Sequence, residues 1–366
     1  MLQSIEIEHF RCFNKIKVNG FKNINLISGL NNAGKTALLE SLLICSFPTP
    51  QSINILRKFR SENDKLITRS PEKVWNSFFN NLEIDKPIQF NTVSSQNEYS
   101  STHINSVNDV SSVIETISNS ELPNLNEKLI SLLGDKFQNS SILNIESRIL
   151  ENTYSFFLLP DKEDDKIGAL GRHVKDFQTV PFLHTHYRIN DTLLASLYST
   201  AKELRKISHF NQILTVIDNS IVGSEIDAPG GEPVIKLILK NEQSLPLGLF
   251  GDAVRKIAEL MLIVLNNDTS VVFIDEIENG IHYTKQEELW RKLFEIVGDK
   301  VQIFATSHSL EMIKAFNKVA SSESLSQHAM YYEMSRNQQN GQIVVNPMTM
   351  EMLKYEIMTN NQFRGE

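Results

Sequence analysis

The sequence predicts an α/β fold in which a mainly parallel core sheet is flanked by helices and interrupted by inserted segments. Near the N-terminus, strand-like residues lead through a glycine-bounded loop into a leucine-rich helix. The last third of the chain alternates apolar strands with amphipathic helices, which is typical of a parallel sheet covered on both faces. A polar stretch and a helical segment lie between these regions, and we expect both to be insertions.

The composition excludes several other classes of protein. The chain has 366 residues, of which 41% are hydrophobic and 22% are charged, as in ordinary globular proteins. Its formal charge of −8 gives no global attraction to nucleic acid or to an anionic membrane, although a local basic groove stays open. The two cysteines exclude a disulfide scaffold and fit a reducing compartment. With neither a signal peptide nor a membrane span recognised, we expect a cytoplasmic protein with no membrane partner.

Three short strands are predicted in the first 30 residues, because apolar and polar side chains alternate there. The apolar positions are Leu2, Ile5 and Ile7, then Ile16 and Val18, then Ile24, Leu26 and Ile27. A loop at 29–36 follows, and the leucines after it fall at helical spacing as far as Leu43.

The middle of the chain gives weaker signals. The segment 48–160 is rich in Ser and Asn, with strands expected at Pro87–Val93, Tyr99–Ile104 and Thr153–Leu159. The charged run Asp161–Lys166 is predicted to be a solvated loop. A helical lobe with Asp191 as N-cap then extends to about Ile217, and a strand is expected at Val234–Leu239.

In the last third, strands are predicted at 270–275 and 301–306. Asp252 is predicted to cap one helix, Thr284 and Glu287 to form a capping box for the next, and Ser309 to start a third. Strands at 330–334 and 342–345 and a helix at 350–358 complete the sheet. This tail has no Asp-x-Asp motif, and metal-ligand spacing of Cys and His is absent elsewhere, so we expect no built-in nuclease.

The octapeptide Gly29–Thr36 matches the phosphate-binding loop pattern G-x-x-x-x-G-K-[ST]. Glycines let the backbone wrap a phosphate, and the N-terminus of the following helix presents unpaired N–H groups to the anion. Lys35 would neutralise the β- and γ-phosphates, and the Thr36 hydroxyl would ligate Mg²⁺. We therefore predict that nucleotide is bound by Gly29, Asn31, Asn32, Ala33, Gly34, Lys35, Thr36 and Ala37.

The second chemical signal is the apolar strand Val271–Ile274, which ends in Asp275 and Glu276. A helix cap or surface charge is the alternative interpretation, but α/β sheets bind ligands at the carboxyl ends of their strands. Asp275 would hold the Mg²⁺ shell, and Glu276 would polarise the water that attacks the phosphate.

Lys35 and Glu276 lie 241 positions apart, so a large insertion separates the two halves of the predicted site. This layout resembles the ABC-type ATPases, in which an antiparallel β subdomain and a helical lobe intervene. We therefore expect a discontinuous ATPase core at 1–47 and 233–366, a polar insertion with antiparallel strands at 48–160, and a helical lobe at 161–232.

Two further segments resemble the same group. His308 ends the strand after the acidic one, where the ABC-type switch histidine contacts the γ-phosphate. The segment Leu245–Arg255 stands at the signature position, with Gly251 24 residues before Asp275, although it departs from Leu-Ser-Gly-Gly. The resemblance implies that backbone donors of this loop reach the nucleotide of a partner subunit, and the alternative is an ordinary loop and cap. The donors would come from Gly248, Gly251 and the helix that starts at Asp252.

The opening segment Ile7–Phe13 resembles a Phe-Arg-x-Phe-like segment of SMC, RecF and OLD ATPases, which implies that Arg11 approaches the phosphates. Asn279–His282 resembles the loop that crosses the dimer interface in these proteins. Together the motifs are similar to the standalone RecF/OLD-like ATPases of bacterial anti-phage defence cassettes, without the Toprim nuclease of the OLD nucleases. Gln178 is the nominal candidate for the lid-loop glutamine of the group.

This resemblance implies an ATP- and Mg²⁺-dependent hydrolase that works as a homo-oligomer, with Lys35, Glu276 and His308 in catalysis. The first hypothesis is a sensor or regulator of a defence system that controls a separately encoded effector protein. The second is a RecF-like repair ATPase with DNA as partner, against which the charge of −8 weighs modestly. The third is a nucleotide-bound scaffold with little turnover, which the departure at 248–252 suggests.

Overall fold

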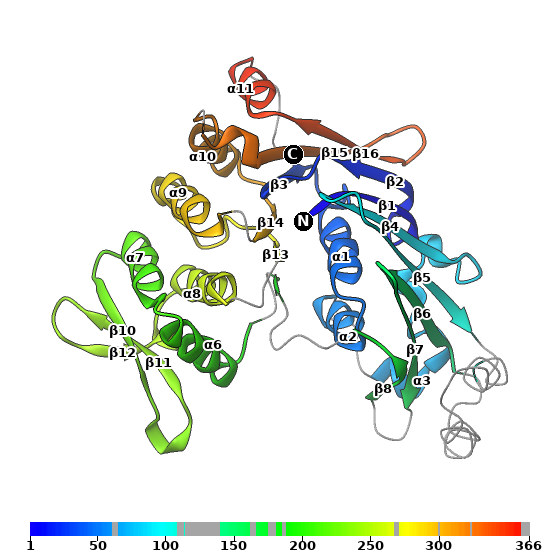
Figure 1. Ribbon diagram of the computed structural model, residues 1–366, viewed down its shortest axis with the longest axis horizontal. Coiled ribbons are helices and arrows are strands. Elements are labelled where there is room, and N and C mark those ends of the chain that lie inside the picture. The colour runs from blue at the N-terminus through cyan, green and yellow to red at the C-terminus, as the bar shows by residue number, and fades with distance from the viewer. Residues whose placement is uncertain are drawn as a thin grey trace.

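The computed structural model describes residues 1–60, 65–107, 113, 140–161, 166–174, 181–184, 188–266, 271–298, 301–322 and 324–359. They form an α/β fold with one mainly parallel sheet, one large antiparallel sheet and a smaller lobe of helices and hairpin strands (Figure 1). The predicted fold class is confirmed. Of the sequence predictions, Gln178 and most of the Asp161–Lys166 run lie outside the described residues.

The core sheet has six strands in the order β16-β15-β3-β14-β13-β9. Five of them are parallel, and β16 pairs antiparallel with β15 at one edge. Their bounds are β3 (Ile24–Gly29), β9 (Phe182–Leu183), β13 (Val271–Ile274), β14 (Gln302–Thr306), β15 (Ala329–Arg336) and β16 (Ile343–Met348). Because Ile274 pairs with Ala305 and Ala305 with Leu26, the carboxyl ends of β13, β14 and β3 lie side by side.

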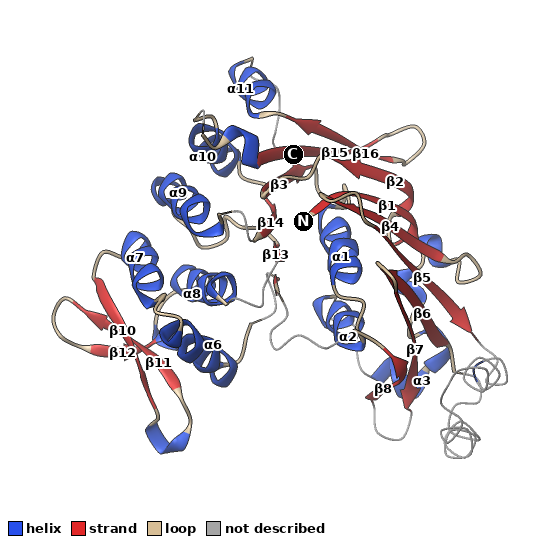
Figure 2. Cartoon of the chain, in the orientation of Figure 1, coloured by secondary structure: helices blue, strands red, loops and turns tan. Residues whose placement is uncertain are grey.

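Helices cover both faces of this sheet, as Figure 2 shows. Successive side chains along these strands pack on opposite faces of the sheet. Ile274 and Ala305 belong to one apolar cluster, and Phe273 and Phe304 belong to the other. This explains why β13 is apolar at every position and β14 is apolar at its three central positions. The helices are α1 (Lys35–Ser46), α8 (Asp252–Leu265), α9 (Gln286–Val297), α10 (Leu310–Ala320) and α11 (Met350–Met358).

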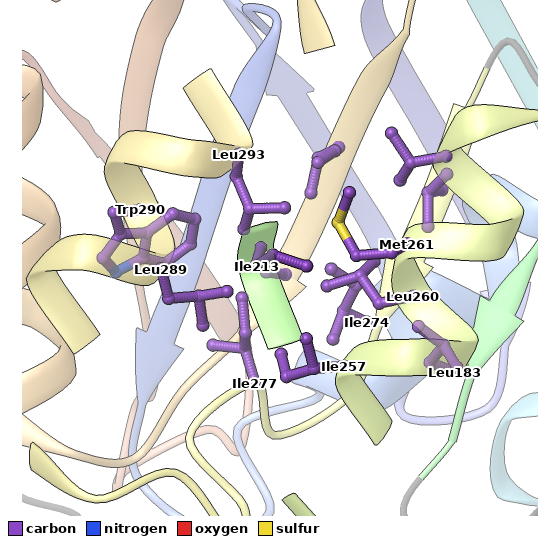
Figure 3. Close-up of a cluster of buried hydrophobic side chains, with 14 of the residues drawn as sticks. Leu183, Ile213, Ile257, Leu260, Met261, Ile274, Ile277, Leu289, Trp290 and Leu293 are labelled. Carbon is purple, nitrogen blue, oxygen red and sulfur yellow. The ribbon is translucent and has the colours of Figure 1, made fainter. Parts of the chain in front are cut away.

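Figure 3 shows one of the two apolar clusters, between α8, α9 and the end of β13. Leu289, Trp290 and Leu293 of α9 lie on one side of it, and all three are fully buried. Ile257, Leu260 and Met261 of α8 lie on the other side, close to Ile274. This packing holds α8 against the strand that carries the two predicted acidic residues.

The antiparallel sheet has seven strands in the order β2-β1-β4-β5-β6-β7-β8. The predicted strands of the first 20 residues and of the polar segment are present, whereas β6 and β8 were not predicted. The bounds are β1 (Leu2–Phe10), β2 (Phe13–Asn19), β4 (Ile88–Ser94), β5 (Tyr99–Val107), β6 (Ile142–Ile149), β7 (Asn152–Asp161) and β8 (Lys166–Arg172). Two helices, α2 (Pro50–Phe59) and α3 (Lys65–Arg69), and short 3-10 turns at 71–73, 76–78 and 80–82 accompany this sheet.

The smaller lobe consists of two helices and a three-stranded sheet in the order β10-β11-β12. The helical signal at 191–217 corresponds to α6 (Asp191–Glu203) and α7 (Ile207–Ile217). The strands are β10 (Ile221–Asp227), β11 (Val234–Leu239) and β12 (Ser244–Pro246), of which only β11 was predicted.

Strand pairing crosses the boundaries of the proposed division into 1–47, 48–160, 161–232 and 233–366. β1 of the first segment pairs with β4 of the second, and β10 of the third pairs with β11 of the last. β9, within 161–232, joins the core sheet. In the part of the chain that is described, no helix has the length and apolar character to cross a membrane.

Three predicted helix caps are wrong. Asn190, not Asp191, caps α6 by accepting a hydrogen bond from the backbone N–H of Leu193. Gly251 is the N-cap of α8, so Asp252 is its first helical residue. The predicted capping box of Thr284 and Glu287 is absent because a 3-10 turn, Tyr283–Lys285, precedes α9. Ser309 does cap α10, as predicted.

Candidate active site

The loop from Gly29 to Thr36 joins β3 to α1, and its shape depends on two glycines. Gly29 has φ 140°, and a Cβ there would lie 1.9 Å from the carbonyl oxygen of Met334. Gly34 has φ 90°, and a Cβ there would lie 2.9 Å from Sγ of Cys12. Gly34 is also the N-cap of α1 and supplies no side-chain acceptor, so the first N–H groups of the helix stay available to an anion.

The side chain of Lys35 folds back onto its own loop. Its ammonium donates to the carbonyl oxygens of Gly29 and Leu30, each at 2.8 Å. Burial lowers the pKa of Lys35 to about 8, against the opposing effect of the nearby carboxylates of Asp275, Glu276 and Glu278. A phosphate would give this ammonium a charged acceptor in place of two neutral carbonyls.

Asp275 lies directly after β13 and faces the phosphate-binding loop. The hydroxyl of Thr36 lies 3.2 and 3.3 Å from its two carboxylate oxygens, and the hydroxyl of Thr306 donates to Oδ1 at 2.6 Å. Hydroxyl and carboxylate oxygens are the ligands that Mg²⁺ prefers. The residue pair Thr36 and Asp275 therefore fits a magnesium ion, and Thr306 orients the carboxylate.

Glu276 and His308 lie next to each other, 35% and 31% exposed in their side chains. Nε2 of His308 is 3.9 Å from Oε1 of Glu276, while Oε2 accepts a hydrogen bond from Asn279 at 2.6 Å. The backbone of Glu276 has φ 51°, a left-handed conformation that is uncommon for a residue with a side chain.

A cavity of about 760 Å³ lies over the phosphate-binding loop. It brings together most of the loop with Arg11 and His308, whereas Gly29, Ala33, Asp275 and Glu276 are not among the residues that line it. The residues that line it are Arg11, Cys12, Asn31, Asn32, Gly34, Lys35, Thr36, Ala37, Arg60, Ser77, Phe79, Asn81, Leu82, His308 and Arg336. Its size suits a nucleotide.

Two arginines share one buried carboxylate at the edge of this cavity. Glu40 of α1 is fully buried and pairs with Arg11 at 3.0 Å and with Arg60, at the C-terminus of α2, at 2.7 Å. Arg11 also donates to Ser77, and its guanidinium lies over the ring of Phe78. Arg60 was not predicted. Its signal was Glu40 itself, because a carboxylate inside an apolar helix requires a cationic partner.

His184 also escaped the sequence analysis. It follows the two-residue strand β9, its Nε2 lies 3.8 Å from Oδ2 of Asp275, and its ring stacks on Phe59 at 4.5 Å between centroids. Its side chain is 7% exposed. A strand of two residues leaves no periodic pattern, so nothing in the sequence marked this histidine.

The loop at 248–252 lies apart from the cavity over the phosphate-binding loop. Gly251 caps α8, and Gly248 lines a small pocket of about 70 Å³ beside α6. Asp252 lines another cavity of about 320 Å³, together with His184, Arg188 and Lys256. Neither pocket shares a lining residue with the large cavity, so the chain does not bring this loop to its own phosphate-binding site.

Residues 24–314 match the protein family described as "AAA domain, putative AbiEii toxin, Type IV TA system". The chain belongs to this family. The AAA-domain protein is also 25% identical over 342 residues to a Helicobacter pylori protein named ATP/GTP phosphatase, covering 87% of this chain and 88% of that protein. The family, this relative and the fold identify a P-loop ATPase.

Solved structures of SMC heads share the fold of this AAA-domain ATPase. An SMC head bound to the C-winged helix domain of ScpA matches with a TM-score of 0.50 and 9% identity, over 97% of this chain and 99% of that chain. A Pyrococcus furiosus SMC head bound to the C-terminal domain of ScpA matches with a TM-score of 0.50 and 8% identity, over 98% of each chain. The chain thus has an ABC-type, SMC-related ATPase fold.

Proposed function

We propose that the chain hydrolyses ATP in the cavity over the phosphate-binding loop, with Lys35, Thr36, Asp275, Glu276 and His308 as its working residues. The observation that carries this proposal is the contact between the Thr36 hydroxyl and the Asp275 carboxylate, at 3.2 and 3.3 Å. It joins the phosphate-binding loop to the acidic strand across 239 positions of sequence. Neither group alone would define a site for a nucleoside triphosphate.

The phosphates would be bound by backbone N–H groups at the start of α1 and by the ammonium of Lys35. The N–H groups at the start of α1 face the phosphates, and the ammonium of Lys35 turns from the carbonyls of Gly29 and Leu30 to the β- and γ-phosphates. Thr36 and Asp275 would hold Mg²⁺, which neutralises phosphate charge when it is bound. Arg60 and Arg11 add positive charge at the rim of the cavity.

Hydrolysis needs a base that directs water at the γ-phosphorus. Glu276 accepts a proton from that water while its oxygen bonds to phosphorus and the bond to the bridging oxygen of ADP breaks, which yields inorganic phosphate and ADP. His308 stands 3.9 Å from the carboxylate and lines the cavity, where it would contact the γ-phosphate. Asn279 orients Glu276 through its 2.6 Å hydrogen bond.

The separate position of the 248–252 loop supports a homodimer in which each loop completes the site of the partner. Gly248, Gly251 and the start of α8 at Asp252 would offer backbone donors to the other protomer's γ-phosphate. ATP then holds two heads together, and its hydrolysis releases them. A dimer of this kind couples nucleotide turnover to the distance between two surfaces.

We further propose that this cycle regulates a separately encoded effector in a bacterial anti-phage defence system. Two observations support this role: the resemblance to standalone defence ATPases, and a family description that includes a toxin of a type IV toxin–antitoxin system. The release of the partner head on hydrolysis would then free or activate the effector.

The experiment compares wild type with Glu276→Gln in steady-state ATP hydrolysis, with and without duplex DNA. We expect DNA-independent turnover in the wild type and a loss of about 10²- to 10⁴-fold in the variant, the contribution of a general base. Light scattering should show an ATP-dependent dimer that the variant retains. Stimulation by DNA above about tenfold would favour the repair ATPase instead, and a wild type without turnover would favour a scaffold.

A further inference from the structure

Glu276 has an unusual backbone conformation. This residue follows the fully buried strand β13 and has φ 51°, in the left-handed region that disfavours residues with a Cβ. Its N–H donates to Oγ1 of Thr306 at 2.8 Å. A backbone of this kind persists only where its surroundings hold it, and such conformations cluster at functional sites.

A lysine on α8 helps to stabilise the left-handed backbone at Glu276. Lys256 is the fifth residue of α8, and its ammonium donates to the main-chain carbonyl oxygens of both Asp275, at 3.2 Å, and Glu276. These are the two carbonyls that flank the left-handed turn. The ammonium therefore bonds to the peptide groups that set the direction of the Glu276 side chain, and not to the carboxylate.

A second contact joins the same two segments. Gly280, four residues after Glu276, has φ 79°, and a Cβ there would lie 3.0 Å from the backbone nitrogen of Ala253 in the first turn of α8. The start of α8 is itself anchored, because Arg255 donates to the carbonyl oxygen of Ile189 and to Asp191, each at 2.9 Å. The loop Asp275–Gly280 and the start of α8 thus pack together as one unit.

We propose that Lys256 is a positioning residue for ATP hydrolysis. Its hydrogen bonds hold the backbone turn at Glu276, so the direction of the Glu276 carboxylate depends on the position of α8 and of the 248–252 loop that precedes it. This inference rests on the proposed role of Glu276 as the base. Because Gly251 caps the helix that carries Lys256, a partner that displaces the loop also moves the donor of both carbonyl bonds. Dimerisation could in this way change the orientation of Glu276 within one protomer.

The test replaces Lys256 with Met, which keeps the length of the side chain and removes its donors. We expect kcat to fall about 10- to 100-fold, because only the geometry of the base changes. The affinity for ATP should stay within about twofold, both for Lys256→Met alone and for Lys256→Met combined with Glu276→Gln. Lys256→Arg should recover part of the lost kcat. Lys206→Met is the matched control, since Lys206 donates to the carbonyl of Leu265 at the other end of α8, and it should leave kcat unchanged.

A double-mutant cycle separates positioning from general folding. If Lys256 acts through Glu276, Lys256→Met lowers turnover no further once Glu276→Gln is present. An unchanged kcat in Lys256→Met, or equal losses of kcat and ATP affinity, would overturn the inference. Should wild type lack turnover, or Glu276→Gln keep it, the proposed function fails instead. A crystal structure of Lys256→Met then decides: residue 276 leaving the left-handed region supports the positioning role, and its staying there refutes it.

Discussion

The cavity over the phosphate-binding loop is lined by residues from the two ends of the chain and by residues from its middle, and the two groups are held in different ways. The ends place Lys35 and Thr36 in the wall of the cavity, and Asp275 against Thr36, through the backbone, because these residues follow β3 and β13, which both pair with β14 in one parallel sheet. The middle places Arg60 through a side chain, the buried carboxylate of Glu40. Backbone placement leaves a motif in the sequence, whereas placement by a distant ion pair leaves only the carboxylate of Glu40 as a signal and does not reveal which residue pairs with it.

Glu40 is where the two groups meet. It accepts from Arg11 of the N-terminal hairpin and from Arg60 of the inserted helix α2. We therefore expect a change at Lys35 to weaken ATP binding strongly and a change at Arg60 to weaken it less.

The largest effect is expected for Lys35→Ala. This change removes the ammonium that two carbonyls hold at the entrance to α1, and with it the charge-assisted bonds to the phosphates. We expect ATP affinity to fall by about 100-fold or more, as two such bonds imply. Isothermal titration with ATP measures it, with Lys17→Ala, on the exposed face of β2, as control. Unaltered binding would mean that this loop does not hold the phosphates.

A smaller effect is expected for Arg60→Met. The variant keeps Glu40 paired with Arg11 and removes one cation from the cavity. We expect the KM for ATP to rise about 3- to 10-fold with kcat nearly constant, the cost of one charged contact. Lys58→Met is the matched control, since Lys58 is an exposed cation on the same helix. A fall in kcat alone would instead place Arg60 at the reacting phosphate.

The smallest effect is a pH dependence of stability. In the folded, ligand-free protein burial lowers the pKa of Lys35 from 10.5 to about 8. Between these two values the unfolded chain binds a proton that the folded chain lacks, so this lysine's contribution to the free energy of unfolding rises with pH. The difference in Tm between wild type and Lys35→Met should therefore shift in favour of the wild type from pH 7.5 to 9.5, as thermal melts would measure. A constant difference would contradict the lowered pKa.

The sequence predicted the fold where one pattern determined one element. The P-loop, the strand before Asp275 and the cap at Ser309 depend on neighbouring residues, and the structure has all three elements. The caps predicted at Asp191 and Asp252 are wrong by one residue, because the preceding Asn190 and Gly251 are the N-caps. The cap predicted at Thr284 is wrong because that residue lies in a 3-10 turn. Local patterns locate a helix better than its first residue.

The missed groups are those whose position depends on distant contacts. His184 reaches Asp275 only because β9 pairs with β13, and Thr306 reaches it only because β14 lies between β13 and β3. In the sequence Lys256 is one of several charged residues on an amphipathic helix, and its two carbonyl acceptors lie about 20 residues further along the chain. No spacing along the chain encodes such contacts.

The crowded approach of Gly29 to Met334 has a consequence for protein synthesis. β3 has neighbours only in β14 and β15 among the described strands, so the strand that carries the phosphate-binding loop waits for residues about 280 to 310 positions further along. A nascent chain can fold its N-terminal hairpin early but has no sheet on which to mount the loop. We therefore expect the phosphate-binding loop to reach its final position only after most of the chain has been synthesised.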